Sequence, residues 1–189
     1  MPRKQFESYT KFALSETEVK RCLLKCDSTE KELIIRLGVF FGLRRADMAK
    51  LKRTDFDFIN HELTYWEEKK NRKRTLPMDA EIEVAVRKHM NATGTETTPE
   101  YLFENPSSST MYRRFQEILE DAEIPPPDGR TGRPFHALRG TCYKQWKKRG
   151  MPVEQVAVML GDTVSTAMMH YGMATTSEIK DFIGVGRTN

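Results

Sequence analysis

The sequence predicts a mainly α-helical fold that carries one small three-stranded antiparallel β-sheet, which is an α+β arrangement. Two patterns lead to this fold class. Apolar residues recur at helical spacing along most of the 189-residue chain, and between residues 56 and 77 the pattern changes to the alternation typical of strands. The length suits one domain with a single hydrophobic core.

The predicted helices before the sheet have recognisable ends. Ser15 and Glu18 form a capping box, in which each side chain satisfies a backbone amide at the start of a helix. The next helix places a stripe of apolar residues on one face, and Gly42 ends it. After a lead-in over residues 1–14, the predicted helices span residues 15–25, 27–41 and 45–51.

The predicted sheet is a meander with two turns. Residues 56–59 alternate between apolar and polar types, Asn60–His61 is a turn, and residues 63–66 are rich in β-forming types. Basic residues 69–73 form the second turn, and residues 74–77 form the third strand. Helices resume after the sheet, over residues 79–89, 108–122, 134–149, 153–160 and 166–170, with a tail helix over 177–182.

Composition excludes several classes of protein. The longest apolar run, residues 37–43, is far shorter than the ~20 residues that a membrane-spanning helix needs. The first five residues contain no apolar stretch, so we expect no secretory signal peptide. Three cysteines cannot all pair, and we interpret Cys22 and Cys26 as apolar helix residues rather than zinc ligands. We therefore expect a reduced, cytoplasmic protein with no metal and no cofactor.

Basic residues are clustered, although the overall charge is nearly balanced at 31 Lys and Arg against 27 Asp and Glu. One cluster places five cations within residues 69–74, and a second lies within residues 144–149. Such clusters attract polyanions, of which nucleic acid is the commonest. The alternative is that both are solvated basic faces.

Two arginines stand where they are able to bind an anion. His136 and Arg139 are three residues apart and share one face of a helix, beside a stripe of apolar residues. Arg44 follows the most apolar helix, and we expect Asp47 to hold its guanidinium group, because an unpaired buried charge is costly. Each pair also suits an ordinary structural role, as a surface His–Arg pair or an Arg–Asp ion pair.

Taken in order along the chain, these residues resemble the catalytic domain of the tyrosine recombinases, also called phage integrases. That family carries an arginine in a Gly-Leu-Arg context, a lysine in a β-hairpin turn, a His-x-x-Arg helix, a Leu-Gly-His segment and a terminal tyrosine. The resemblance runs from about residue 15 to residue 174. The matching residues are Arg44, Lys69 (with Lys70 as the alternative), His136, Arg139, Asp162 and Tyr171.

The resemblance implies a site-specific DNA recombinase that cuts and rejoins strands through a covalent 3′-phosphotyrosine, without metal or ATP. Tyr171 is the implied nucleophile, and forked hydrogen bonds from Arg44 and Arg139 stabilise the charge on the phosphate. Lys69 is implied to protonate the leaving 5′-oxygen, and His136 to act as a base toward the tyrosine or to donate to the phosphate. The basic clusters then contact the DNA backbone, through Lys70, Arg72, Lys73, Arg74, Lys144, Lys147 and Lys148.

One residue departs from the family pattern. Asp162 stands where the family has a histidine or a tryptophan that donates a hydrogen bond to the phosphate, and an ionised carboxylate cannot donate. Either Asp162 turns away to hold an arginine, which we favour, or burial keeps it protonated, or the enzyme is weakened. Thr163 offers a substitute hydroxyl.

The expected domain organisation follows from the same resemblance. Residues 1–14 are a lead-in, residues 15–174 form the catalytic domain, and residues 175–189 form a tail. We expect no N-terminal core-binding domain, so the chain is either an excised catalytic domain or a minimal one-domain recombinase. The tail either docks on a neighbouring protomer or packs back on its own chain.

Double-stranded DNA is the expected partner, bound by a homodimer or homotetramer, with no membrane and no small-molecule substrate. The expected location is the cytoplasm, in association with the nucleoid, or the host cytoplasm if a virus or plasmid encodes the chain. Two alternative functions stay open. One is a DNA-binding or regulatory protein that keeps the fold but has lost the chemistry, which Asp162 favours; the other is a topoisomerase-like enzyme that relaxes DNA.

Overall fold

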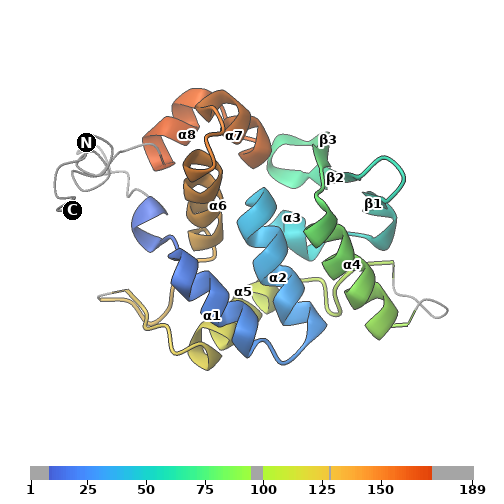
Figure 1. Ribbon diagram of the computed structural model, residues 1–189, viewed down its shortest axis with the longest axis horizontal. Helices are drawn as coiled ribbons and strands as arrows, with labels where there is room; N and C mark the ends of the chain where they lie inside the picture. Colours follow the sequence, from blue (N-terminus) through green and yellow to red (C-terminus); the bar gives the residue numbers. More distant parts are fainter. Residues whose placement is uncertain (1–8, 95–99, 128, 172–189) are drawn as a thin grey trace, which may run out of the picture.

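Helices α2 (Thr29–Phe41) and α6 (Ala137–Lys148) run side by side through the middle of the molecule (Figure 1). The computed structural model describes residues 9–94, 100–127 and 129–171. The remaining α-helices are α1 (Glu16–Lys25), α3 (Arg45–Ala49), α4 (Ala80–Ala92), α5 (Ser108–Asp121), α7 (Val153–Leu160) and α8 (Val164–Tyr171). The strands are β1 (Phe56–Asp57), β2 (Glu62–Glu67) and β3 (Arg72–Pro77), and 3₁₀ turns cover Tyr9–Phe12, Arg53–Asp55 and Glu68–Lys70. The mainly helical fold with a small antiparallel sheet is therefore confirmed.

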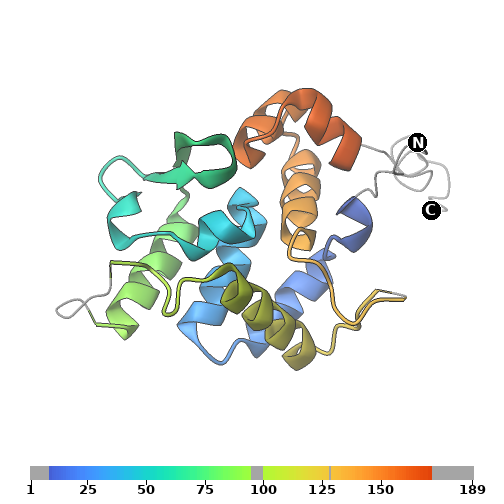
Figure 2. The same ribbon diagram turned by 180° about the vertical axis from the view of Figure 1, so that it is seen from behind.

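Helix α2 is deeply buried because α1, α4, α5 and α6 all pack against it. Helix α5 covers the side that faces the viewer in Figure 2. Leu33, Ile35 and other residues pointing in several directions are buried, so the apolar surface is wider than the single predicted stripe. Gly38 lets α6 come close, since a Cβ there would lie 2.6 Å from Leu138 Cδ1. The two central helices therefore pack with little space between them.

The helix starts agree with the capping signals in the sequence. Ser15 Oγ accepts a hydrogen bond from Glu18 N at 3.2 Å, and Glu18 Oε2 accepts one from Ser15 N at 2.7 Å, which confirms the capping box. Ser28 caps α2 and Asp79 caps α4. Gly42 ends α2 with a left-handed φ of 60°, as predicted.

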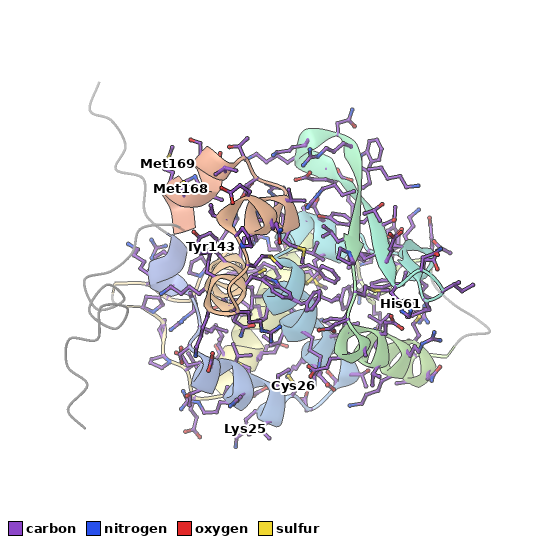
Figure 3. All side chains as sticks on the ribbon, turned by 45° about the horizontal axis from the view of Figure 1, so that its top comes forward. Lys25, Cys26, His61, Tyr143, Met168 and Met169 are labelled. Carbon is purple, nitrogen blue, oxygen red and sulfur yellow. The ribbon has the colours of Figure 1, made fainter. Side chains whose placement is uncertain are left out.

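The sheet has the order β1-β2-β3 and is antiparallel throughout, with β2 and β3 paired along their whole length. Strand β1 is shorter than the predicted 56–59 strand. The Asp57 side chain accepts hydrogen bonds from the backbone N–H groups of Ile59 and Asn60, and so bends the chain early into the turn that contains His61 (Figure 3). These hydrogen bonds to the Asp57 side chain therefore end the strand at residue 57, although the sequence pattern favours a strand up to residue 59.

Alternate residues of β2 face inward. Leu63, Tyr65 and Glu67 are buried, whereas Trp66 between them is 53% exposed. Leu63 and Tyr65 belong to the hydrophobic core, but Glu67 is a charged residue at a buried position. It lies at the end of the hairpin that is next to α7 (Figure 1).

Helices α7 and α8 pack on each other and on α6 at one end of the molecule (Figure 1). Helix α8 begins earlier than predicted because Thr163 Oγ1 accepts a hydrogen bond from Thr166 N at 3.1 Å. Met168 and Met169 lie on its outer side and are 52% and 46% exposed (Figure 3). The predicted tail helix over 177–182 lies outside the described residues.

The cysteines are free thiols at positions 22, 26 and 142. Burial raises the pKa of Cys22 to about 11 and the pKa values of the other two to about 12, so all three are protonated at neutral pH. Over the described ranges, no three His, Cys, Asp or Glu side chains gather in a way that suits a metal ion. None of the helices seen there is long and apolar enough to cross a bilayer.

Candidate active site

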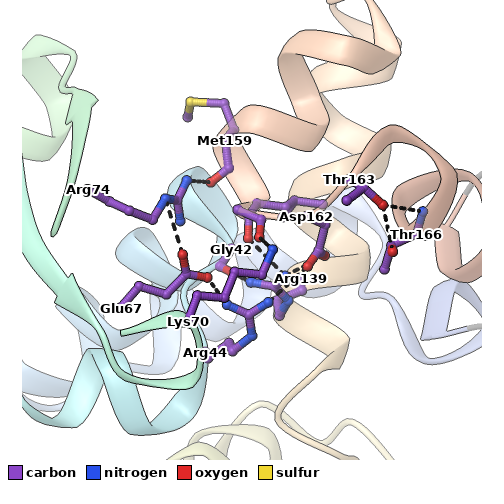
Figure 4. A network of polar contacts seen from close by, with 12 residues as sticks. Gly42, Arg44, Glu67, Lys70, Arg74, Arg139, Met159, Asp162, Thr163 and Thr166 are labelled. Carbon is purple, nitrogen blue, oxygen red and sulfur yellow. Dashed lines mark hydrogen bonds and ion pairs between the residues drawn. The ribbon is translucent and has the colours of Figure 1, made fainter. Parts of the chain in front are cut away.

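Two arginine side chains from distant parts of the chain meet at one carboxylate (Figure 4). Arg44 immediately precedes α3, and Arg139 lies in the first turn of α6. Asp162, which follows α7, accepts a hydrogen bond from Arg44 Nη2 on Oδ1 at 2.9 Å and one from Arg139 Nη2 on Oδ2 at 2.7 Å. The carboxylate bridges the two guanidinium groups, so the prediction that Asp162 holds an arginine is confirmed.

Helix ends fix the position of Arg139. Its side chain is only 3% exposed, and its guanidinium donates to the carbonyl of Gly42 and, at 3.0 Å, to that of Leu160. Gly42 ends α2 and Leu160 is the last residue of α7, so neither carbonyl has a donor within its own helix. The partial negative charge at both helix ends also attracts a cation. Arg139 therefore donates to two carbonyl oxygens that would otherwise be buried without a hydrogen-bond donor.

Glu67 belongs to the same cluster, although the sequence motifs do not single it out. Its fully buried carboxylate accepts hydrogen bonds from Arg44 and, at 2.8 Å, from Arg72 Nε, and it lies 3.8 Å from Arg74 Nε. Burial by itself raises the pKa of Glu67, but the hydrogen bonds from Arg72 and Arg44 outweigh burial and lower it. The sequence signal for this residue is the alternation of inward and outward residues along β2, which places Glu67 on the same inward face as Leu63 and Tyr65.

Asp47 does not hold Arg44, so that expectation is wrong. Its Oδ1 accepts a hydrogen bond from the backbone N–H of Glu68 at 3.1 Å instead. Burial raises the pKa of Asp47, partly offset by this hydrogen bond. Asp47 therefore fixes the start of the turn that carries the two candidate lysines, while the carboxylates that pair with Arg44 are Glu67 and Asp162.

The structure brings Lys70, rather than Lys69, into the arginine network (Figure 4). Both belong to the 3₁₀ turn between β2 and β3. Lys70 Nζ donates to the carbonyl of Gly161 at 2.6 Å, next to Asp162. Lys69 is exposed and makes no hydrogen bond or ion pair with the part of the chain that the structure describes. Lys70 therefore ties the turn to α7, and Lys69 projects from it.

Arg74, one of the predicted DNA contacts, is buried and bonded within the protein. Its guanidinium donates to Tyr65 Oη at 2.6 Å and to the carbonyl of Met159 at 3.1 Å, so it fastens β3 to α7. Gly161 allows this approach, because a Cβ there would lie 2.5 Å from Arg74 Nη1. The donors of Arg74 are used within the protein, and its contact with DNA stays a prediction.

The second basic cluster lies away from the arginine site. Lys148 is nine residues from Arg139, or two and a half helical turns, and so lies on the opposite face of α6. Lys148 Nζ pairs with Glu16 at 2.7 Å, and Lys144 lines a shallow cavity beside the same glutamate. Contacts from Lys144, Lys147 and Lys148 to DNA stay a prediction, as do those from Arg72 and Lys73.

His136 lies at the start of α6 and is half-buried. Burial and the nearby charges of Arg139 and Arg44 lower its pKa to about 4. The ring is therefore neutral at pH 7, which leaves one nitrogen as an acceptor and the other as a donor. A neutral imidazole here is able either to accept a proton or to donate to an anion.

Tyr171 is the last residue of α8, and its side chain lies outside the described part of the structure. Helix α8 packs on α7 and α6. Those two helices carry or precede Asp162 and Arg139. The backbone of the predicted nucleophile thus belongs to a helix that adjoins the arginine site.

Comparison with known proteins gives one family. The sequence profile of the phage integrase family matches residues 12–178. A tyrosine recombinase XerC-like protein of Caldanaerobacter subterraneus subsp. tengcongensis is 25% identical over 186 residues, and the match covers 78% of this chain and 46% of that protein. The chain therefore spans about half the length of the curated relatives that it matches.

Solved structures with a similar fold include two recombinases. The crystal structure of XerA recombinase superimposes with a TM-score of 0.76 at 20% identity, over 94% of this chain and 65% of that chain. The crystal structure of the XerH site-specific recombinase bound to its difH substrate gives a TM-score of 0.67 at 18% identity, over 92% and 54% of the two chains. At these identities the likeness concerns the fold.

An NMR titration should give His136 a midpoint near pH 4 rather than near its ordinary value of 6.5. The unfolded chain then binds more protons between these two values, so the free energy of unfolding falls as the pH falls from 6.5 toward 4. His136→Gln removes this part of the acid sensitivity. A midpoint near 6.5 would contradict the environment described for the ring.

Asp162→Asn should destabilise the protein by about 3 kcal/mol or more in urea unfolding, because two largely buried guanidinium groups lose their shared counter-charge. Inorganic phosphate should stabilise this variant more than the natural protein, since the two guanidinium groups then lack their shared counter-charge and attract an anion. The matched control, Asp121→Asn, breaks a more exposed ion pair with Lys31 and should cost less than about 1 kcal/mol. Equal stability of the two variants would contradict the bridging role.

Proposed function

This chain belongs to the phage integrase family, and we propose on that basis that it is a site-specific DNA recombinase, which cuts and rejoins strands through a covalent 3′-phosphotyrosine. The observation that carries the proposal is the convergence of Arg44 and Arg139 on a single anionic group, the carboxylate of Asp162. Two forked guanidinium groups also suit a phosphodiester. The structural relative crystallised with its difH substrate supports DNA as the ligand of this fold.

Asp162 holds the two arginines together in the DNA-free protein, and the scissile phosphate takes over their hydrogen bonds when DNA binds. Both groups are anionic oxygen acceptors of similar geometry. The exchange keeps the guanidinium groups paired with an anion throughout, which avoids leaving a buried charge unpaired. In the transition state the arginines stabilise the charge that develops on the nonbridging oxygens. Asp162 thereby acts as a positioning residue rather than as a donor to the phosphate.

The chemical step transfers a phosphoryl group from the 5′-oxygen of the DNA to a tyrosine oxygen. The phenolic oxygen of Tyr171 forms a bond to phosphorus while the bond to the 5′-oxygen breaks, and the phosphotyrosine retains the energy needed to reseal the strand. The ring of His136 is neutral before the step and accepts the phenolic proton, and the negative charge of the bound phosphate favours this by offsetting the nearby arginines. Lys69 gives a proton to the departing 5′-oxygen, and Lys70 keeps the turn against Gly161. We place this reaction on double-stranded DNA, in a homodimer or homotetramer within the cytoplasm.

Tyr171→Phe should abolish covalent attachment to DNA while leaving affinity within about twofold, because only the nucleophilic oxygen is removed. The assay uses a pool of duplexes of randomised sequence, each with a nick near its centre that lets the cut end diffuse away. Adducts are recovered after denaturation, and sequencing their DNA gives the cleavage site.

Three outcomes separate the alternatives when the assay is combined with measurements of DNA binding and of relaxation of a supercoiled plasmid. An adduct that persists in Tyr171→Phe means that another residue is the nucleophile. Tight DNA binding with no adduct from the natural protein favours a regulatory protein without chemistry. Relaxation of supercoiled DNA with no sequence preference among the adducts favours a topoisomerase-like enzyme.

Lys69→Ala should slow cutting of an ordinary substrate by about 10²–10⁴-fold, because the leaving oxygen loses its proton donor. Replacing the bridging 5′-oxygen by sulfur should restore the rate, since a thiolate leaves without a proton. Lys70→Ala is the matched control on the same turn and should show no such rescue. Rescue of Lys70→Ala instead would assign the acid to Lys70.

A further inference from the structure

Arg44 and Arg45 are neighbours in the chain, but their side chains point to different parts of the molecule. Arg44 donates to the two carboxylates of the active site. Arg45 Nε donates to Ser108 Oγ at 2.6 Å, and its guanidinium lies 5.6 Å from the centre of the Tyr112 ring. Ser108 and Tyr112 belong to α5, which packs against α3. Arg45 therefore lies outside the carboxylate network.

Arg45 carries a charge that no carboxylate of the described ranges neutralises through an ion pair, although its side chain is half-buried. Arg44, one residue earlier, has two such partners. A guanidinium group has five N–H donors, and the hydrogen bond to Ser108 uses one of them. A half-buried cation with donors in excess favours an incoming anion, because pairing offsets the cost of removing the charge from water.

A cavity of about 480 Å³ opens beside Arg45. Its walls also include Arg130 and His136. Gln116 of α5 fixes the loop that forms one wall, since its side-chain amide accepts from Arg133 N at 2.9 Å and donates to Arg133 O at 2.8 Å. The volume falls within the ~300–1,000 Å³ typical of ligand pockets, so a phosphate with its sugar fits.

His136 connects this cavity to the active site. Its ring belongs to the cavity wall. After burial, the charges that lower the pKa of His136 are those of Arg139, Arg44 and Arg45, in that order. The ring therefore lies within electrostatic reach of both arginine positions. A DNA strand bound beside His136 would therefore be within reach of Arg44 and Arg139 as well as of Arg45.

We propose that this cavity binds the backbone phosphate next to the scissile phosphate on the same DNA strand. We call it the Arg45 pocket, formed by Arg45, Tyr112, Arg130 and His136. The inference rests on the proposed function, because it takes Arg44 and Arg139 as the holders of the scissile phosphate. Arg45 pairs with the adjacent phosphate, and the ring of Tyr112 offers an apolar surface to the attached sugar. A second fixed phosphate sets the register of the strand against the nucleophile.

The test measures affinity for intact duplexes that carry the cleavage site mapped from the covalent adducts. Arg45→Gln keeps a donor for Ser108 but removes the charge. It should weaken binding about tenfold or more and reduce the slope of log K against log salt by about one. A series of duplexes replaces one phosphate at a time by a neutral methylphosphonate. On the duplex neutralised next to the cleavage site, Arg45→Gln should have no further effect.

Two further variants keep the test specific. Arg45→Lys retains the charge and should restore the salt slope. Arg87→Ala removes an exposed arginine of α4 whose guanidinium lies 3.9 Å from the centre of the Phe58 ring, and its effect should be equal on all duplexes. Thermal unfolding of each variant checks that the fold is intact.

Failure of this inference and failure of the proposed function give different results. If Arg45→Gln changes binding equally on every duplex, or not at all, while the natural protein forms adducts, the Arg45 pocket is refuted alone. If the natural protein forms no adduct with any duplex, the recombinase proposal fails. In that case the slope of log K against log salt, measured on unmodified random-sequence DNA for the natural protein and for Arg45→Gln, still reports whether Arg45 contacts a phosphate.

Discussion

Ion pairs between largely buried arginines and carboxylates hold the candidate active site together. Four guanidinium groups surround two carboxylates, and the residues are Arg44, Arg72, Arg74 and Arg139 around Glu67 and Asp162. Buried carboxylates are stable only when they are paired, and here every pair links separate elements. Because the cations outnumber the anions, the cluster keeps a positive charge that suits a phosphate. The interactions that stabilise the site therefore also leave it with the charge that the proposed ligand needs.

Helix ends determine where this cluster forms. The carbonyls that end α2 and α7 converge on Arg139, although Gly42 lies 97 residues before it in the chain. On the other side, the hairpin is fastened to α7 by Arg74 and Lys70. The site exists only when α2, α6, α7 and the hairpin are all in place. Substitutions at these contacts should therefore change stability and activity together.

The sequence predicted the helices, the sheet and the order of the candidate residues because those features are local or follow a known motif. The capping box at Ser15 and the glycine end of α2 were found in this way. Glu67, the second partner of Arg44, was not predicted, because it becomes buried only when distant parts of the chain pack around it. The burial of Arg74 was not predicted for a related reason. A basic residue in a charged run looks the same in the sequence whether it faces solvent or a helix end.

The most direct test of the account is a crystal structure of the Tyr171→Phe protein bound to an uncut duplex. The quantity to measure is the distance from each of the two guanidinium groups, Arg44 and Arg139, to the nearest nonbridging oxygen of the phosphate that is cut. We expect hydrogen bonds of about 2.7–3.2 Å from both, with Asp162 no longer bridging them. A phosphate beyond hydrogen-bond reach of both arginines, with Asp162 still between them, would contradict it.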